Sequence, residues 1–192
     1  NNNIFSKPMT ALETERLKLI PLTLEQAEMF THLDSRLEDS LGLNRAEREL
    51  TTHFRDAIRK YTLQWMKDDP ENYLFATIWV IVEKASNTVA GDIGFKRKPD
   101  ENGYVEIGYS TQPKFRVQGY MTEAIGAMVN WAFTYPEVTA VIAETREDNI
   151  PSIKALKKNG FYEFKYSKPP EPSNLESMMS DVKMLWHIRD RE

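Results

Sequence analysis

Residues 115–124 have the sequence FRVQGYMTEA, and this stretch decides how the rest of the chain is interpreted. Gly119 stands just before an alanine- and methionine-rich segment with helical spacing, and Pro113, Lys114 and Arg116 precede it. A glycine here permits a tight turn, and it also lets a ligand approach the backbone closely. The free N–H groups at the start of a helix attract anions, assisted by the helix dipole. The stretch therefore predicts either a plain turn or a phosphate-binding turn.

The phosphate alternative needs more than the helix dipole, which supplies only about 0.3–1 kcal/mol. Several N–H groups and a cation such as Arg116 or Lys114 would have to contribute. The sequence contains neither G-x-x-x-x-G-K-[ST] nor G-x-G-x-x-G, the two common phosphate-binding glycine motifs. A phosphate site at Gly119 would therefore be of a third kind.

Composition indicates one soluble globular domain, because 41% of the 192 residues are hydrophobic and 28% are charged. We predict this domain over residues 12–192, after an unstructured lead-in over 1–11. The net charge of −4 gives no general attraction to nucleic acid or to a membrane surface. No apolar run approaches about 18 residues, and no signal-peptide pattern appears.

The cysteine count and the histidine spacing limit the chemistry. The chain has no cysteine, which excludes disulfides and thiolate metal sites and fits a cytoplasmic location. His32, His53 and His187 are scattered without metal-ligand spacing, so we predict no metal site.

Hydrophobic periodicity predicts a mixed α/β fold with about seven strands and four helices. The helices are expected over 23–37, 46–68, about 120–135 and 149–161. The strands are expected over 16–22, 73–83, 88–97, 103–111, 138–146, 161–167 and 181–188. The remaining proline-rich segment, 168–180, is predicted to be a long loop that covers a site.

Two motifs resemble those of the GCN5-related N-acetyltransferases (GNAT), in particular the RimJ/RimL-like ribosomal-protein N-terminal acetyltransferases. They are EIGYSTQPKFRVQGYMTEA at 106–124 and NIPSIKALKKNGF at 149–161, and ETERLKLIPL at 13–22 is similar to the opening strand of that branch. The likeness covers about 12–188. The pyrophosphate motif of the family is [QR]-x-x-G-x-[GA], and this chain has Arg116, Gly119 and then Met121 where the family has glycine or alanine.

The resemblance implies a GNAT fold with a mostly antiparallel sheet, in which two neighbouring strands part to admit the pantetheine arm of acetyl-CoA. The backbone of Ser110 and Thr111 would bond that arm, and Asn149 would anchor it near its thiol. The remaining residues would cradle the pyrophosphate: Arg116, Gln118, Gly119, Tyr120, Met121 and Thr122. The side chain of Met121 would point away from the phosphates.

Glu106 is a candidate general base. It lies mid-strand, with Val105 and Ile107 on the opposite face. A carboxylate in a partly dry cleft can take a proton from the attacking amine, directly or through water. Neutralising a lysine-like amine at pH 7 costs about 4.6 kcal/mol, whereas a peptide α-amine costs only about 1–1.4 kcal/mol, so a weak base would suffice for the latter. The alternative is a glutamate on a solvated strand face.

Ser152 is a candidate general acid by resemblance, because the serine of N-x-x-S in this branch lies near the thioester sulfur. It would protonate the departing thiolate or donate a hydrogen bond to it. The alternative is an ordinary first-turn serine that satisfies helix N–H groups.

The resemblance implies an acetyl-CoA-dependent N-acetyltransferase in which an amine attacks the thioester directly. A backbone N–H near Thr111 would polarise the carbonyl. The acceptor is left open among a protein N-terminus, a polyamine and another small amine, and the chain is compatible with a homodimer. One rival is a non-catalytic acyl-CoA sensor, which would have no use for both Glu106 and Ser152. Another is a module on the same fold that binds no CoA.

Overall fold

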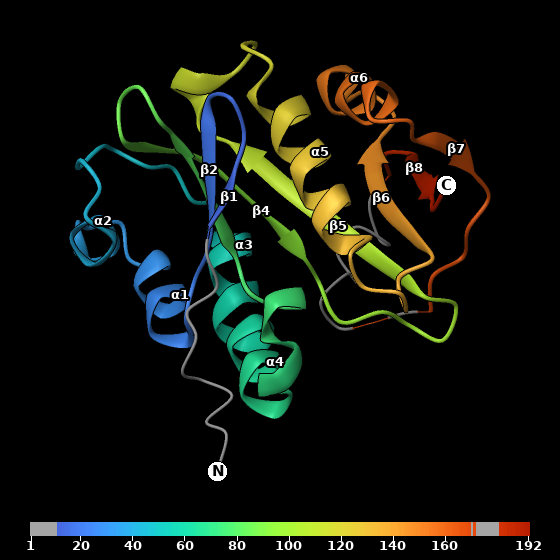
Figure 1. The fold of residues 1–192 in the computed structure, drawn as a ribbon, viewed down its shortest axis with the longest axis horizontal. Coiled ribbons are helices and arrows are strands. Elements are labelled where there is room, and N and C mark those ends of the chain that lie inside the picture. Colours follow the sequence, from blue (N-terminus) through green and yellow to red (C-terminus); the bar gives the residue numbers. More distant parts are fainter. Residues whose placement is uncertain (1–10, 170, 172–180) are drawn as a thin grey trace.

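The computed structural model describes residues 11–169, 171 and 181–192, and its centre is one eight-stranded sheet (Figure 1). The strand order is β1-β2-β3-β4-β5-β6-β8-β7, and every neighbouring pair is antiparallel except β5 and β6. The strands are β1 (Leu12–Glu13), β2 (Leu17–Pro21), β3 (Trp79–Glu83), β4 (Thr88–Phe95), β5 (Tyr104–Thr111), β6 (Ala140–Arg146), β7 (Tyr162–Phe164) and β8 (Met184–Asp190).

Six α-helices accompany the sheet within the described ranges. They are α1 (Leu24–Phe30), α2 (Arg36–Leu41), α3 (Thr52–Ala57), α4 (Leu63–Asp68), α5 (Tyr120–Ala132) and α6 (Ile150–Lys158). A π-helical turn over Ile58–Thr62 joins α3 to α4, and short 3₁₀ helices cover Pro70–Phe75 and Pro113–Phe115. None of the described helices is long and apolar enough to cross a bilayer.

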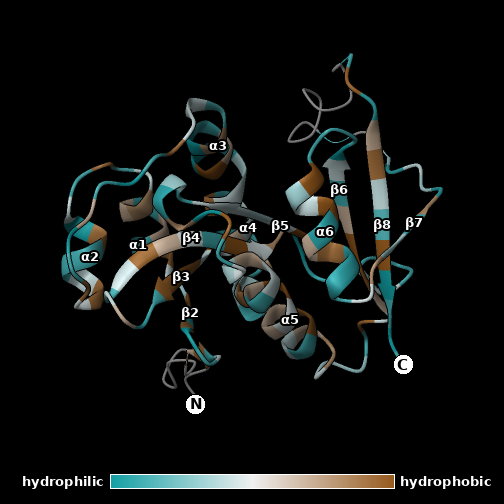
Figure 2. Cartoon of the chain, turned by 90° about the horizontal axis from the view of Figure 1, so that it is seen from above, coloured by the Kyte–Doolittle hydropathy of each residue, from teal (hydrophilic) through white to brown (hydrophobic). Residues whose placement is uncertain are grey.

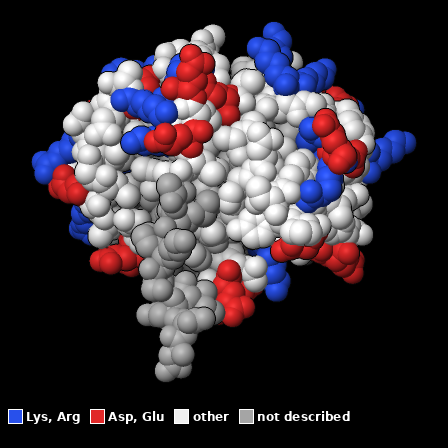
Figure 3. Space-filling view, in the orientation of Figure 1, with Lys and Arg blue, Asp and Glu red and all other residues white. Residues whose placement is uncertain are grey.

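Two hydrophobic cores lie on the two faces of the sheet, as alternate side chains of β3 show. Trp79 and Ile81 pack on the side of α5, whereas Val80 and Val82 pack on the side of α1 to α4. A strand that is covered on both faces is expected to be a continuous apolar run. The hydrophobic central strands lie between the two groups of helices (Figure 2), and charges of both signs are interspersed on the outer surface (Figure 3).

The predicted fold class is confirmed, but the helix over 23–37 was wrong as a single element. Helix α1 ends at Phe30, and α2 begins only at Arg36. The carboxylate of Asp34 accepts the N–H of Arg36 at 3.0 Å, and this local bond starts a second helix. The two-residue strand β1 was also missed, because two residues carry no measurable periodicity.

Two further elements begin well after their predicted first residue. The helix expected from residue 46 begins at Thr52, where the hydroxyl of Thr51 caps it by accepting the N–H of Phe54. The strand expected over 73–83 begins only at Trp79, because Pro70 opens a 3₁₀ helix that places Phe75 in the core at 2% exposure. Residues 1–10 of the lead-in expected over 1–11, and most of the loop expected over 168–180, lie outside the described residues.

The parallel pair β5 and β6 is short, and this positions the site. The two strands pair only through Tyr104–Ala140, Val105–Val141 and Glu106–Ile142. Beyond Glu106, β5 continues along β4, whereas β6 continues along β8. The two strands therefore diverge toward the N-termini of α5 and α6 (Figure 1). The expected parting of two strands is therefore confirmed.

Candidate active site

Gly119 forms the turn at the mouth of the gap between β5 and β6. Its φ of +78° lies in the left-handed region that favours glycine, and α5 begins at the next residue. The first N–H groups of α5 have no partner within the helix, so they are available to an anion. The atom nearest to a Cβ added at Gly119 is Nη2 of Arg16, at 3.4 Å. The turn therefore leaves its backbone accessible, with a cation beside it.

Arg16 is a member of this site that the sequence does not single out. Its Nη1 donates to the carbonyl oxygen of Gln118 at 2.8 Å, and its Nε donates to Glu123 of α5 at 2.9 Å. The guanidinium also lies 4.3 Å from the ring centre of Tyr120. Because about 100 residues separate Arg16 from the turn, no local pattern reveals the contact.

The side chains of the turn itself mostly brace it. Nε of Arg116 donates to the carbonyl of Thr111 at 3.3 Å, and Gln118 donates to the carbonyl of Lys114 at 3.0 Å. Met121 is partly buried against the core on the α5 side of the sheet. Its side chain therefore packs toward the core.

Tyr120 and Thr122 connect the same turn to the rest of the fold. The hydroxyl of Tyr120 donates to Glu83 of β3, and the carbonyl of Thr122 accepts a bond from Asn159 at 3.0 Å. These contacts fix the start of α5 against the sheet and against the end of α6.

Ser152 faces the gap from α6, and the structure supplies it with a partner. Asn149 caps α6 by accepting the N–H of Ser152 at 3.3 Å. The hydroxyl of Tyr109 on β5 lies 2.6 Å from Oγ of Ser152. Burial raises the pKa of Tyr109, so the phenol stays protonated at neutral pH. Sequence reasoning missed Tyr109, although its place next to Gly108 in EIGYST was visible.

Glu106 lies at the last pair of β5 with β6 and is 7% exposed. Its Oε1 contacts Nζ of Lys168 at 2.7 Å, and its Oε2 contacts Nζ of Lys96. Both oxygens are therefore engaged by ammonium groups. The expected acid is present, but it is held in an ion-pair cluster rather than free in a cleft.

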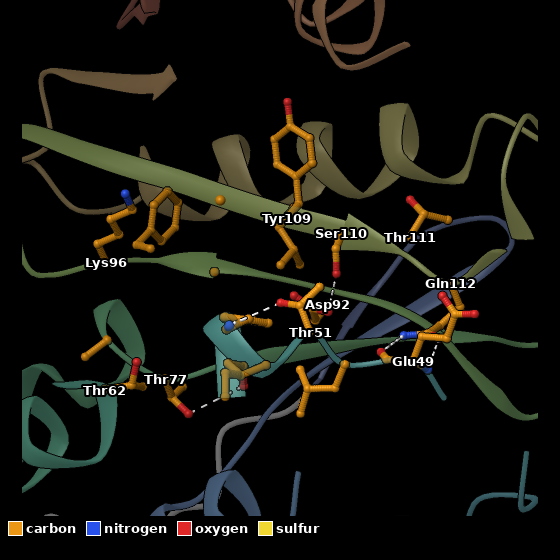
Figure 4. A pocket seen from close by; sticks show the side chains of 18 of the residues that line it. Glu49, Thr51, Thr62, Thr77, Asp92, Lys96, Tyr109, Ser110, Thr111 and Gln112 are labelled. Atoms are coloured by element: carbon orange, nitrogen blue, oxygen red, sulfur yellow. Dashed lines mark hydrogen bonds between the residues drawn. The ribbon is translucent and has the colours of Figure 1, made fainter. Parts of the chain in front are cut away.

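Ser110 points to the opposite side of β5 from Tyr109. Its hydroxyl donates to Oδ2 of Asp92 on β4 at 2.6 Å (Figure 4). Asp92 is 5% exposed, and burial raises the pKa of its carboxyl to about 6. The neighbouring Thr111 ends β5 opposite Gly91 of β4.

A cavity of about 420 Å³ opens beside Asp92 and Ser110 (Figure 4). It lies between the sheet and helices α3 and α4, and much of its wall is apolar. Its lining includes Leu50, Phe54, Trp65, Ile93, Phe95 and Gly108, with Glu49, Asp92, Lys96 and Arg116 as charged members. Its size suits a small ligand or the end of a peptide.

Comparisons with known proteins agree with this geometry. The acetyltransferase (GNAT) domain family model matches residues 16–162, and the chain belongs to that family. A Bacillus subtilis protein called "Uncharacterized N-acetyltransferase YjdG" is 31% identical over 153 residues, which is 80% of this chain and 90% of the relative. Acetyl transfer is therefore the class of reaction that this fold serves here.

Solved structures share the fold at lower identity. Ribosomal-protein-S5-alanine acetyltransferase from Vibrio fischeri superposes with a TM-score of 0.67 at 17% identity, covering 96% of this chain and 98% of that one. RimL, a ribosomal L7/L12 alpha-N-protein acetyltransferase solved with coenzyme A, gives 0.63 at 15% identity, covering 94% and 98%.

Proposed function

We propose that this protein transfers an acetyl group from acetyl-CoA to a primary amine by direct attack of the amine nitrogen. The observation that carries the proposal is the gap that opens after the Glu106–Ile142 pair, directly before the left-handed turn at Gly119. An unpaired strand edge and a set of free helix N–H groups suit an amide-containing arm that ends in a diphosphate. Relatives named as N-acetyltransferases support the same activity.

We assign the cofactor contacts to the residues around this gap. The backbone of Ser110 and Thr111 would pair with the pantetheine amides, and Asn149 would hold the arm from the other side. The backbone from Gln118 to Thr122, including Gly119, Tyr120 and Met121, would bind the diphosphate, with Arg116 and Arg16 as the nearby cations. Bound acetyl-CoA supplies a thioester carbonyl carbon that an amine can attack.

The residues on the two faces of β5 would divide the proton transfers. Ser152, backed by Tyr109, faces the gap and would donate a proton to the leaving sulfur. Glu106 and Asp92 lie on the other side, where a carboxylate would take the proton of the amine. Glu106 is the base candidate that the sequence indicates, although it must release Lys96 or Lys168 before it can act.

The acceptor would be a peptide N-terminus or a small amine, because the cavity has a size that suits either. The likeness to RimL and to the S5-alanine acetyltransferase favours a peptide N-terminus only at the level of fold. A reducing compartment such as the cytoplasm would suit a chain without cysteine.

Thermal melting with acetyl-CoA and with adenosine tests the proposal first. A ligand that binds only the folded state raises the melting temperature, so acetyl-CoA should raise it and adenosine should do so far less. Thiol release with a panel of amines and peptides then separates an enzyme from the alternative, an acyl-CoA sensor. A melting temperature that saturating acetyl-CoA leaves unchanged would contradict both.

A further inference from the structure

Asp92 is an unusual residue for its position on a central strand. It pairs with Val80 of β3 and with Ser110 of β5, and it is 5% exposed. Its neighbours Ala90 and Ile93 on β4 belong to the hydrophobic core. A buried carboxylate without a cation carries a large desolvation cost, so such groups gather where function requires them.

The charged groups around Asp92 are committed to other partners. Arg48 of the 43–51 segment, whose charge favours ionised Asp92, is paired with Glu38 at 2.6 Å. Lys96, further along the chain from β4, pairs with Glu106.

Glu49 and Arg116 line other parts of the same cavity, and Tyr109 points to the far side of β5 (Figure 4). Within the described residues, the only side-chain hydrogen bond to Asp92 is the one that Ser110 donates to Oδ2. A carboxylate accepts through both oxygens, so Oδ1 has capacity for a donor from a ligand.

We propose that Asp92 receives the ammonium group of the acceptor at the wall of the cavity and takes its proton. The cavity would thereby select primary amines carried on an apolar body. This inference rests on the proposed function and specifies its acceptor. Asp92 is better placed than Glu106 for this role, because both oxygens of Glu106 are already bound by lysines.

The apolar requirement follows from the rest of the lining. Leu50, Phe54 and Trp65 line the cavity that borders Asp92, and an aliphatic or aromatic body would bury its surface against them. A second ammonium group, as in a polyamine, would be repelled near Lys96 and Arg116, and Glu49 is the one other carboxylate among the lining residues that could receive it.

An ammonium ion carries three nitrogen-bound protons, and the first moves to Asp92 to leave a neutral amine. The amine nitrogen forms a bond to the acetyl carbon, and the carbon–sulfur bond breaks with its electron pair going to sulfur. The second proton passes from nitrogen to sulfur, either directly or through Ser152, and the third stays on the amide. Asp92 then releases its proton to solvent, so one proton is produced for each acetyl group transferred.

Calorimetric binding of 2-phenylethylamine and hexylamine to the enzyme without acetyl-CoA tests the inference directly. 2-Phenylethanol and hexanol serve as neutral controls of matched shape. The wild-type protein should bind the amines at least tenfold more tightly than the alcohols at pH 7.5. Its amine affinity should fall about tenfold by pH 5, because a carboxyl with a pKa of about 6 is then mostly protonated.

The variant Asp92→Asn should lose both the preference for amines and its pH dependence. Asp56→Asn removes the same charge from an exposed position of α3, the helix whose Phe54 lines the cavity, and should behave as the wild type. Equal binding of amine and alcohol by the wild type, or an unchanged preference in Asp92→Asn, would overturn the inference.

Melting with acetyl-CoA keeps the two proposals apart. Asp92→Asn should retain the acetyl-CoA-dependent rise of the wild type. If acetyl-CoA raises the melting temperature of the wild type but the wild type binds amine and alcohol equally, the inference fails while the proposed function stands. If the amine preference is present without any response to acetyl-CoA, the proposed function fails while the amine site stands.

Discussion

The hydroxyl of Tyr109 lies 2.6 Å from Oγ of Ser152, and this contact joins β5 to α6 across the gap between β5 and β6. A serine hydroxyl alone is a poor acid. A phenol bonded to it can replace the proton that serine gives up, so the pair can act as a relay. The contact thus gives a physical reason for a serine at this place in the site.

Removal of either hydroxyl should slow acetyl transfer. We expect Ser152→Ala to lower kcat by about 10- to 100-fold and Tyr109→Phe by a smaller factor, because a positioned acid typically contributes about 10²–10⁴-fold. The measurement is kcat with thioesters of different leaving-group acidity, and the losses should shrink as the thiol becomes more acidic. Tyr162→Phe, an exposed tyrosine bonded to Asp190, is the control. Losses that do not depend on the leaving group would refute an acid role.

Glu106→Gln should reduce stability and slow all acceptors by similar factors. The change would leave Lys96 and Lys168 beside each other without their shared carboxylate, which is unfavourable for partly buried charges. Melting temperature and kcat/KM with a lysine-like amine and with a peptide α-amine are the measurements, with exposed Glu163→Gln as control. A much larger loss for the lysine-like amine would return the base role to Glu106 and count against Asp92.

Gln112 should govern acceptor binding without affecting the cofactor. Its side chain accepts the N–H of Glu49 at 2.7 Å and donates to the carbonyl of Glu49 at 3.0 Å, so it pairs with the cavity wall as a strand would. Gln112→Ala leaves both backbone groups without a partner, at a cost of about 1–3 kcal/mol.

We expect a raised KM for the acceptor and an unchanged Kd for acetyl-CoA in this variant. The exposed Gln64, which bonds Asp68 at 2.8 Å, provides the matched control Gln64→Ala. An acceptor KM equal to that of the wild type would show that the wall is held by other contacts.

Asp92→Asn should stabilise the protein at neutral pH while it impairs the reaction. Burial raises the pKa of Asp92 from 3.8 to about 6, so the folded state binds this proton more tightly than the unfolded state does. The stability contribution of the carboxyl is therefore full below about pH 4 and is lost as the pH rises through about 6. Residues that destabilise a fold for the sake of activity show this behaviour.

The free energy of unfolding of Asp92→Asn at pH 8 should exceed that of the wild type by on the order of 3 kcal/mol, and this difference should vanish near pH 4. Urea unfolding at both pH values measures it, with Asp56→Asn as the charge-matched control. A variant less stable than the wild type at pH 8 would show that the ionised carboxylate is satisfied in the fold.

The sequence predicted those parts of the fold whose signals are local. The caps of α6, with Asn149 at its start and Gly160 in the left-handed conformation after its end, were readable because each depends on a few adjacent residues. The turn at Gly119 was readable for the same reason. The break at Asp34 and the 3₁₀ helix at Pro70 were missed because their apolar spacing also fits longer elements.

The site was predictable only where its members are close in the chain. Ser110, Gly119, Asn149 and Ser152 follow from two motifs. Arg16 and Asp92 join the site through contacts with segments distant in the chain, and no spacing in the sequence marks them. Tyr109 lies inside the first motif, but its contact with Ser152, 43 residues away, depends on the fold. The ion pairs of Glu106 depend on Lys168, 62 residues away, so its engagement was equally invisible.

The affinity for acetyl-CoA of two matched glycine variants tests the central claim most directly. Gly119 and Gly42 both adopt left-handed φ values, +78° and +67°, and Gly42 follows α2, a helix far from α5 in the fold (Figure 1). Alanine at either position costs about 1–2 kcal/mol of backbone strain, but only Gly119→Ala places a methyl group at the proposed diphosphate site. We predict that calorimetry gives a Kd at least tenfold higher for Gly119→Ala and a wild-type Kd for Gly42→Ala. Equal Kd values for the two variants would contradict the account.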